Sequence, residues 1–497
     1  MSVVSSERTA KFPDGGVAEG YVSGPPLVVD LDGTLVKTDL LIESILALMK
    51  QHPLCLFAFP GWIAGGKAWF KHQVASRVRL DPGTLPWRIQ LIDYLVQQHA
   101  DGRTLVLATG SDIGIARQMA DHLKLFDEVF ASDGTVNLCG EAKRDLLVCK
   151  LGAGGFDYAA DGGSSGRCDL AIWMAARKAI LVNPGRSVTR AAARLGKTDL
   201  VFSDGKNGFA AYLKALRPAH WLKNLLVFVP LLAAHRFHDL ALLEKSLLAF
   251  VAFGCCASSG YLFNDLADLE SDRHHPDKRH RPLAAGDLPL SFGLIAGPVL
   301  FVLGCVIGAL ASPLLLVILA AYCAMSAVYS LRAKKVAILD VLFLAGLYTV
   351  RIMAGSAATG IWPSHWLLAF STFLFFSLAL AKRYSELVLM RRVDGNAAKA
   401  RAYELQDGEL LAAMGIASGY LAVLVLALYI AADRARVHYS RTEMLWLLCP
   451  LLLYWISHVW LTAHRGDLSH DPVVFATGDR TSRILILLSV AAAGLAL

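Results

Sequence analysis

The chain has 497 residues, of which 55% are hydrophobic, and its mean hydropathy is +0.48. A soluble protein of this length is rarely so apolar, so the composition argues against a wholly soluble protein and indicates membrane spans. The formal net charge of +7 fits the basic loops of a membrane protein, and no nucleic-acid-binding motif accompanies it, so we expect no nucleic-acid partner.

Composition divides the chain into three parts. Residues 1–24 lack the apolar core of a signal peptide, so we expect a disordered N-terminus that begins in the cytoplasm. Residues 25–205 alternate short apolar runs with helical stretches, which predicts an α/β domain with a parallel sheet. The expected strands lie in "PPLVVDLDGTL", "RTLVLATGSD", "GFDYAADGG" and "KAILVNP". Residues 206–497 hold long apolar segments and form the expected membrane domain.

An apolar, helical stretch between Leu40 and Val78 separates the first two predicted strands. It fits either a packing subdomain or a helical cap that contacts lipid, and we favour the cap.

Two aspartates, Asp30 and Asp32, directly follow the first predicted strand. Carboxylates at the carboxyl end of a parallel strand lie where α/β proteins bind ligands. Two residues apart, one carboxylate can attack phosphorus while the other donates and removes protons. The alternative is a simple turn, because Asp-Gly is common in loops.

The "DLDGT" string resembles the first motif of the haloacid-dehalogenase (HAD) superfamily of hydrolases, and the similarity covers roughly residues 25–185. The resemblance implies that Asp30 is the nucleophile, Asp32 the acid/base and Asp30 with Asp161 a Mg²⁺ site. It also implies that Thr109 and Lys143 bind phosphate, with Lys150 as a less favoured choice for the lysine. The family pattern departs at "GGSSGRC", which separates Asp161 from Asp169, so Asp169 is either a metal ligand or a helix cap.

Nine apolar segments of about 20 residues predict a bundle of nine transmembrane helices. Their centres lie near Val227, Phe250, Val299, Leu319, Leu344, Phe373, Leu424, Leu451 and Leu488. With a cytoplasmic start, the bases concentrate in the loops that return to the cytoplasm, which predicts a multi-pass inner (plasma) membrane protein with its active sites on the cytoplasmic side. The opposite loops are poor in bases, except for Arg434, Arg436 and Arg441.

The stretch "NDLADLESD" places Asp265, Asp268 and Asp272 at i, i+3 and i+7, positions that share one face of a continuous helix. Acids so placed repel one another unless a cation lies among them, and Mg²⁺ bound by carboxylates and substrate phosphates is the natural arrangement. Asn264 would add an oxygen ligand or a hydrogen bond, and the basic residues Lys278, Arg279 and Arg281 would hold phosphate oxygens. The alternative is a solvated loop of mixed charge.

This motif, followed by "RPLAAG", resembles the UbiA superfamily of intramembrane prenyltransferases over roughly residues 210–497. The resemblance implies nine helices around a cavity open to the cytoplasm and Mg²⁺-assisted ionisation of a diphosphate. The second aspartate-rich motif of many members is absent, and "ALAKRYSEL", "SHDPVVFATGDRTS", "HPDKRHRPLAAG" and "GLYTVRIMAG" look like the decaprenyl-phosphate phosphoribosyltransferase branch.

That branch implies phosphoribosyl pyrophosphate as donor and polyprenyl phosphate as acceptor. Arg351, Lys382 and Arg383 would then neutralise a second phosphate, and Glu386 would position a ribose hydroxyl. For Lys382 and Arg383 the positive-inside bias is the alternative explanation.

Three functions remain open: phosphoribosyl transfer to polyprenyl phosphate, prenyl transfer to an aromatic or other polar acceptor, and non-enzymatic lipid transport or reception. In the first, the HAD-like domain would remove the phosphate that the product retains.

Overall fold

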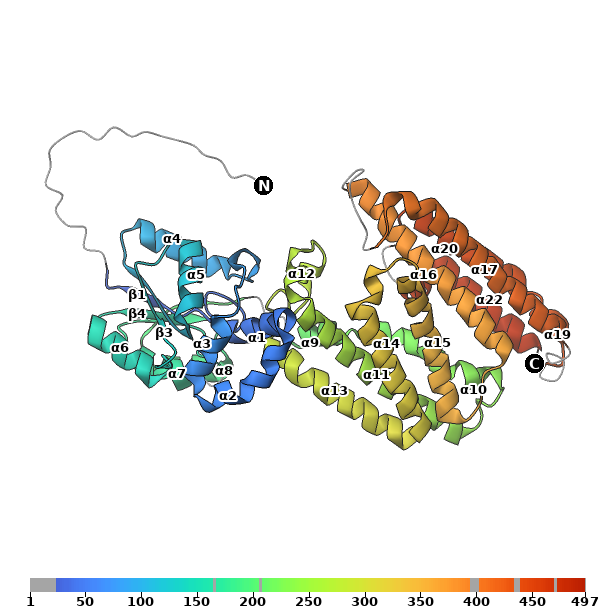
Figure 1. The fold of residues 1–497 in the computed structure, drawn as a ribbon, viewed down its shortest axis with the longest axis horizontal. Coiled ribbons are helices and arrows are strands. Elements are labelled where there is room, and N and C mark those ends of the chain that lie inside the picture. Colours follow the sequence, from blue (N-terminus) through green and yellow to red (C-terminus); the bar gives the residue numbers. More distant parts are fainter. Residues whose placement is uncertain are drawn as a thin grey trace. The chain divides into compact units, whose positions relative to one another are not determined.

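The computed structural model describes residues 24–163, 167–204, 208–393, 402–432, 439–468 and 472–496. The expected disorder of residues 1–23 and the bases Arg434 and Arg436 lie outside the described residues. The chain divides into two compact units, residues 1–207 and 208–497, here called the sheet unit and the helical unit. Figure 1 labels their elements.

The sheet unit contains six strands, all parallel, in the order β3-β2-β1-β4-β5-β6. The strands are β1 Leu27–Val29, β2 Leu105–Asp112, β3 Glu128–Ser132, β4 Asp157–Ala160, β5 Ala179–Val182 and β6 Thr198–Phe202. The larger helices are α1 Leu40–Gln51, α2 Phe59–Ala64, α3 Lys67–Ala75, α4 Ile89–Ala100, α5 Ile113–Leu123, α6 Glu141–Leu151, α7 Arg167–Ala175 and α8 Arg186–Leu195. Short 3₁₀ turns are η1 Pro53–Ala58 and η2 Pro82–Thr84. The expected parallel α/β fold is confirmed.

Both faces of this sheet are buried, as a parallel sheet requires. Leu27 and Val29 of β1 join one core with α4 and α5, whereas Val28 joins a second core with α6, α7 and α8. Figure 1 shows these two sets of helices on either side of the strands. Strand order reverses between β1 and β4, and open α/β sheets bind ligands beyond the strand ends at such a point.

The helical unit has no strand among its described residues. Its helices are α9 Gly208–Leu216, α10 Val229–Ala233, α11 Leu240–Ala267, α12 Leu269–His274, α13 Leu290–Ala311, α14 Pro313–Leu331, α15 Leu339–Thr359, α16 His365–Val393, α17 Gly408–Ala431, α19 Thr442–Leu445, α20 Leu448–His464, α21 Pro472–Gly478 and α22 Arg480–Ala496. Its 3₁₀ helices are η3 Pro218–Phe228, η4 Lys278–His280, η5 Ala333–Lys335 and η7 Leu405–Asp407.

Seven helices of the described chain are long and apolar enough to cross a membrane. The expected count of nine is not confirmed, because the segments around Val227 and Leu488 are not among the seven. Val227 lies in the 3₁₀ helix η3, and Leu488 lies in the 17-residue α22, whose first turn carries Arg480 and Arg483. Each is shorter than the roughly 20 residues that an α-helical span needs.

Close contact between η3 and α15 depends on Gly355. A Cβ at this residue would lie 1.9 Å from the carbonyl oxygen of Val227, so any larger side chain would push the two segments apart. The contact positions the polar side chains of η3 beside the middle of α15.

Two candidate active sites

The first site lies at the carboxyl edge of the sheet, between β1 and β4. The backbone N–H of Asp30 donates to Ala159 O over 2.9 Å, which fixes Asp30 beside β4. Gly33 has a φ of +71°, and a Cβ there would lie 2.4 Å from Oδ2 of Asp161. Glycine therefore lets the β1 loop approach the carboxylate that follows β4.

Three carboxylates meet at this edge. Ligand oxygens of Asp30, Asp161 and Asp169 lie within 4.8 Å of one another. Asp169 is thus brought to the site despite its irregular spacing from Asp161, and it lies within the first turn of α7 rather than at the residue before the helix. The donor set is all oxygen, which suits a hard cation such as Mg²⁺.

Lys143 and Tyr158 connect the acidic cluster to the sheet. Lys143 Nζ donates to Asp30 Oδ1 over 2.9 Å, and the Tyr158 hydroxyl donates to Asp169 Oδ1 over 2.8 Å. Burial by itself lowers the pKa of Lys143, yet the charges of Asp30 and Asp169 outweigh it and hold that pKa above its ordinary value. Lys143 therefore stays charged, and it is the lysine that the sequence favoured.

Asp32 lies in a pocket of hydrogen-bond donors. Its carboxylate accepts from Leu40 N at 2.8 Å, from Ser111 Oγ at 2.6 Å and from Thr109 Oγ1 at 3.3 Å. Burial, and then the nearby charge of Asp39, raise the pKa of Asp32 to about 6. A carboxyl group that titrates near neutral pH can both give and take a proton.

The pKa values of two acids of the cluster, Asp161 and Asp169, are also raised. Burial raises the pKa of Asp161 to about 7 and that of Asp169 to about 6, and Asp30 adds to both shifts. One lysine among three carboxylates, two buried and one half-buried, leaves an excess of negative charge, which a bound cation would relieve.

Three supporting residues of this site escaped the sequence analysis. Ser111 lies two residues beyond Thr109 in the same string, and its position next to the predicted strand end was the available signal. Arg88 donates to Gly33 O over 2.9 Å and to Thr34 O over 2.9 Å, which holds the β1 loop. Lys71 of α3 donates to Gly110 O over 2.6 Å, which attaches the cap helices to the end of β2.

The second site lies where α11 meets α12. The expectation of one continuous helix through the three aspartates is wrong, because α11 ends at Ala267 and Asp268 forms the junction. Hydrogen bonds from Asp268 N to Asn264 O and from Asp272 N to Asp268 O nevertheless continue across it. The junction is therefore a local irregularity that leaves Asp265 and Asp272 on a common side.

One arginine bridges these two acids, and a second arginine pairs with Asp265. Arg281 Nη1 donates to Asp265 Oδ1 over 3.0 Å and to Asp272 Oδ2 over 2.6 Å, and Arg217 also pairs with Asp265. Asp265 and Asp272 are buried, at 3% and 2% exposure. Within the described chain, the three acids of this site form no group of ligand atoms close enough to share a metal.

The other residues that the sequence predicted for this site differ in their environments. Asp268 accepts from Lys334 Nζ over 3.2 Å, so it is directed to a different base. Asn264, Lys278 and Lys382 are half-buried, whereas Arg279 is exposed. Lys334 and Arg217 were missed, although Arg217 begins the "RPAHWLKN" string that enters η3.

Arg351 lies deeper in the bundle and is buried, at 4% exposure. Its Nε donates to Asn224 Oδ1 over 3.0 Å, and its guanidinium lies 5.2 Å from the ring centres of Phe253 and Tyr322. Among the described residues no carboxylate forms an ion pair with it, and Nδ2 of Asn224 is buried with no hydrogen-bond partner. Asn224, which the sequence analysis missed, thus offers an unused donor beside a buried cation.

Arg383 has a different environment. It is 1% exposed, and its three nitrogens donate to Asp340 at 2.5 Å, Glu386 at 2.6 Å and Tyr329 at 2.8 Å. Tyr403 donates to the other oxygen of Asp340. The geometry places Arg383 and Glu386 together in one ion-pair network, in which the arginine is fully engaged with protein groups.

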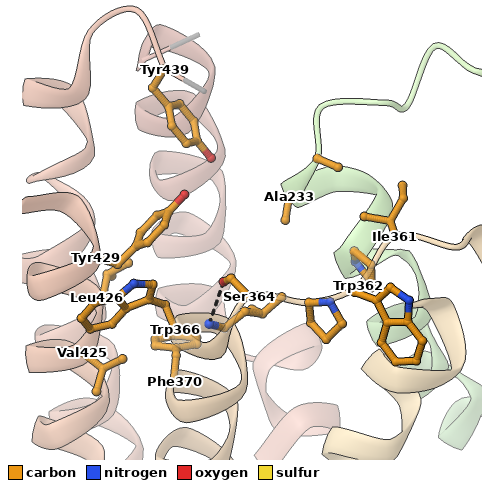
Figure 2. Close-up of a pocket in the computed structure, with 14 residues that line it drawn as sticks. Ala233, Ile361, Trp362, Ser364, Trp366, Phe370, Val425, Leu426, Tyr429 and Tyr439 are labelled. Atoms are coloured by element: carbon orange, nitrogen blue, oxygen red, sulfur yellow. Dashed lines mark hydrogen bonds between the residues drawn. The ribbon is translucent and has the colours of Figure 1, made fainter. Parts of the chain in front are cut away.

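An apolar pocket of about 470 Å³ lies at the other end of the bundle (Figure 2). Its walls come from α10, the α15–α16 connection, the first turns of α16 and the C-terminal part of α17, and they include Ala233, Trp362, Phe370, Leu426 and Tyr429. Figure 2 shows the hydroxyl ends of Tyr429 and Tyr439 directed toward each other across one side. From Asp340 to Thr359, α15 rises by about 28 Å, so the pocket is roughly a hydrocarbon-core thickness from the ionic end of that helix.

Comparisons with known proteins identify the family of the helical unit. The UbiA prenyltransferase family model matches residues 225–496, more than half of the chain. A Sinorhizobium fredii protein (strain NBRC 101917 / NGR234), named uncharacterized protein y4nM, is 34% identical over 92% of this chain and 88% of its own length. The decaprenyl-phosphate phosphoribosyltransferase of Mycobacterium tuberculosis (strain CDC 1551 / Oshkosh) is 32% identical over 60% of this chain and 98% of its own.

A solved structure of a UbiA homolog from Archaeoglobus fulgidus bound to GPP and Mg²⁺ aligns over 58% of this chain and 100% of that chain, with 16% identity and a TM-score of 0.43. The family match and the seven apolar helices together describe a multi-pass membrane protein with a transferase domain. The chain belongs to the UbiA prenyltransferase family.

Proposed function

We propose that the helical unit transfers phosphoribose from phosphoribosyl pyrophosphate to a polyprenyl phosphate. The observation that carries the proposal is two separate groups of donor side chains, Arg217 with Arg281 and Arg351 with Asn224, each of which would bind a phosphate. Along the 3₁₀ helix η3, Asn224 lies about 14 Å deeper than Arg217, so one phosphate cannot occupy both places. A reaction between two phosphorylated substrates makes use of both.

Asp265 and Asp272, with Asn264 and Asp268 beside them, are the residues that would hold Mg²⁺. When bound, the metal would neutralise charge on the departing pyrophosphate. The chain's own contribution is Arg281 and Arg217, which lie against the same acids and would bind diphosphate oxygens. The acceptor phosphate oxygen attacks the ribose carbon that carries the pyrophosphate, that carbon–oxygen bond breaks, and pyrophosphate leaves.

Arg351 and Asn224 would bind the second phosphate through the buried guanidinium and the unpartnered amide. Lys382, half-buried near the ionic end of α16, remains a candidate phosphate contact. For Arg383 we propose a positioning role, because its three protein contacts orient Glu386 toward a fixed place. The apolar pocket of Figure 2 is the place that we propose for part of the polyprenyl chain.

The sheet unit would act as a phosphatase of the HAD type. Asp30 attacks phosphorus, the bond to the ester oxygen breaks, and Asp32 donates its proton to the leaving oxygen. Water then attacks the aspartyl-phosphate, gives a proton to Asp32 and releases phosphate. Lys143 would neutralise the phosphoryl oxygens, Thr109 of β2 would donate a hydrogen bond to them, and Asp30, Asp161 and Asp169 would hold Mg²⁺.

These two activities form a sequence. The ribosyl lipid keeps the phosphate of its donor, which is a phosphomonoester and therefore a substrate for the sheet unit. We propose that the protein lies in an inner membrane and that both sites are on its cytoplasmic side, because the basic loops predict that orientation.

The direct test supplies membranes containing the protein with labelled phosphoribosyl pyrophosphate, Mg²⁺ and polyprenyl phosphate, and measures label in the extracted lipid. Transfer of label supports the proposal. Turnover of a polyprenyl diphosphate with an aromatic acid, and none of phosphoribosyl pyrophosphate, would establish the alternative prenyl transfer. Membership of a transferase family argues against the third alternative, a lipid transporter or receptor.

A further inference from the structure

The connection between α1 and α3 presents large apolar side chains to the outside of the sheet unit. Leu54 is 78% exposed, Phe57 85%, Ile63 61% and Trp69 44%. Single exposed apolar residues are common on proteins, but several large ones in one short connection indicate an interaction surface. We call these four residues the apolar surface of the cap.

The inner side of the same segment is packed. Phe59, Trp62 and Phe70 lie against the core beneath, with ring centres of Phe59 and Phe70 5.4 Å apart and those of Phe59 and Trp62 5.6 Å apart. The segment is therefore held in place by one set of aromatic residues, while a second set points outward. An element built only to complete the core would not need the outward set.

The lysines and arginines along this segment of the sequence are not offset by acids of the same segment. Residues 44–80 contain no aspartate or glutamate, and they carry five bases: Lys50, Lys67, Lys71, Arg77 and Arg79. Lys67 and Arg79 are exposed. Apolar residues with aromatic members, surrounded by lysine and arginine, match the interfacial zone of an anionic bilayer.

The short connection between the two units keeps the sheet unit near a bilayer. Only residues 203–207 separate β6 from α9 of the helical unit, and the helical unit spans the membrane. Such a short connection gives the membrane surface a high effective concentration at the sheet unit, so even weak individual contacts suffice for docking.

We propose that the cap of the sheet unit is a membrane-docking surface, in which Leu54, Phe57, Ile63 and Trp69 enter the interfacial layer of an anionic bilayer while the surrounding bases contact lipid phosphates. A second copy of the chain would lack this complementarity, because the surface would face its own positive charge.

Docking would also affect the substrates of the Asp30 site, an inference that rests on the proposed phosphatase function. Lys71 donates to Gly110 O, and His72 Nδ1 lies 3.0 Å from Asp112 Oδ2. These contacts flank Ser111, which hydrogen-bonds Asp32. The cap and the catalytic edge thus form one connected piece, so docking would present Asp30 to phosphate groups carried by lipid rather than to those free in solution.

The test uses the full chain in nanodiscs of phosphatidylcholine alone or mixed with phosphatidylglycerol, with amide hydrogen exchange of residues 53–64 as the readout. Docking predicts several-fold slower exchange in the anionic discs. The double variant Leu54→Asp, Phe57→Asp should lose that difference. Val96→Asp is the matched control, because Val96 is 48% exposed on α4 and lies outside the cap. Unchanged exchange of β2 shows that the variants remain folded.

Equal exchange in the two kinds of disc, or protection that rises with protein concentration, would overturn the proposal; the second result would indicate a contact between copies. Activity gives a separate readout. The double variant should hydrolyse a soluble phosphomonoester as wild type does and a vesicle-borne one several-fold more slowly. If wild type hydrolyses neither, the phosphatase function fails, while hydrogen exchange still decides the docking.

Discussion

The two acidic sites of this chain balance their charge in opposite ways. At the sheet edge, three carboxylates converge within 4.8 Å, and among the residues that the structure describes only Lys143 forms an ion pair with one of them. In the helical unit, Asp265 and Asp272 are already paired with Arg217 and Arg281. The first arrangement suits a resident cation. The second suits a diphosphate that brings its own metal, because the arginines would bind the diphosphate oxygens and Asp265 and Asp272 would then be available to hold the metal.

The largest expected effect is at the proposed nucleophile. Asp30→Asn should lower hydrolysis of a soluble phosphomonoester by on the order of 10³-fold or more, because an amide cannot form the aspartyl-phosphate. Phosphate release from the purified chain measures this. Asp133→Asn, an exposed aspartate of the same unit, is the control and should retain activity. A comparable loss in both variants would contradict the assignment.

At the second site, the two kinds of aspartate should differ. Asp265→Asn should lower phosphoribosyl transfer by about 100-fold, since it removes a buried partner of two arginines and a proposed metal ligand. The carboxylate of Asp268 is half-exposed and bonded to Lys334. Asp268→Asn should therefore lower the rate about 10-fold less than Asp265→Asn does. Rates at limiting Mg²⁺ test the difference, and equal losses would show that the junction at Asp268 does not separate their roles.

Metal and pH give a smaller effect. Folding raises the pKa of Asp161 from 3.8 to about 7 and that of Asp169 to about 6, so these two groups bind more protons in the folded state than in the unfolded state between pH 4 and 7. Stability without metal should therefore fall as pH rises through this window. Mg²⁺ should then raise the melting temperature of the sheet unit by several degrees at pH 8 and less at pH 5.

Addition of Mg²⁺ should also distinguish the site in the sheet unit from the site at Asp265. Mg²⁺ alone should leave hydrogen exchange around Asp265 unchanged, whereas Mg²⁺ with pyrophosphate should slow it. Slowing by Mg²⁺ alone would contradict the contrast between the sites.

The smallest effect concerns the apolar pocket. Ala233→Trp would fill part of it and should raise KM for a long polyprenyl phosphate a few-fold, with little change for a short-chain analogue. Steady-state kinetics with the two acceptors measure this, and an equal change for both would mean that the pocket does not hold the chain.

Local patterns predicted much of what the structure contains. Asp30, Asp32 and Thr109 follow apolar runs, and strand ends meet at one edge of a parallel sheet, so their association followed from the sequence. The role of Asp169 as a metal ligand or a helix cap was left open, because motif spacing does not show whether the loop after Asp161 brings Asp169 back to the acidic cluster. The break at Asp268 was missed because spacing alone assumes a continuous helix, and the Arg383–Asp340 network joins residues 43 positions apart that no local pattern connects.

The central claim is that the two units act in succession on one lipid. The measurement is the lipid product formed from labelled phosphoribosyl pyrophosphate and polyprenyl phosphate by wild type and by Asp30→Asn. Succession predicts that the variant accumulates the phosphorylated ribosyl lipid, while wild type yields the dephosphorylated one. Identical labelled lipids from the two proteins would contradict it.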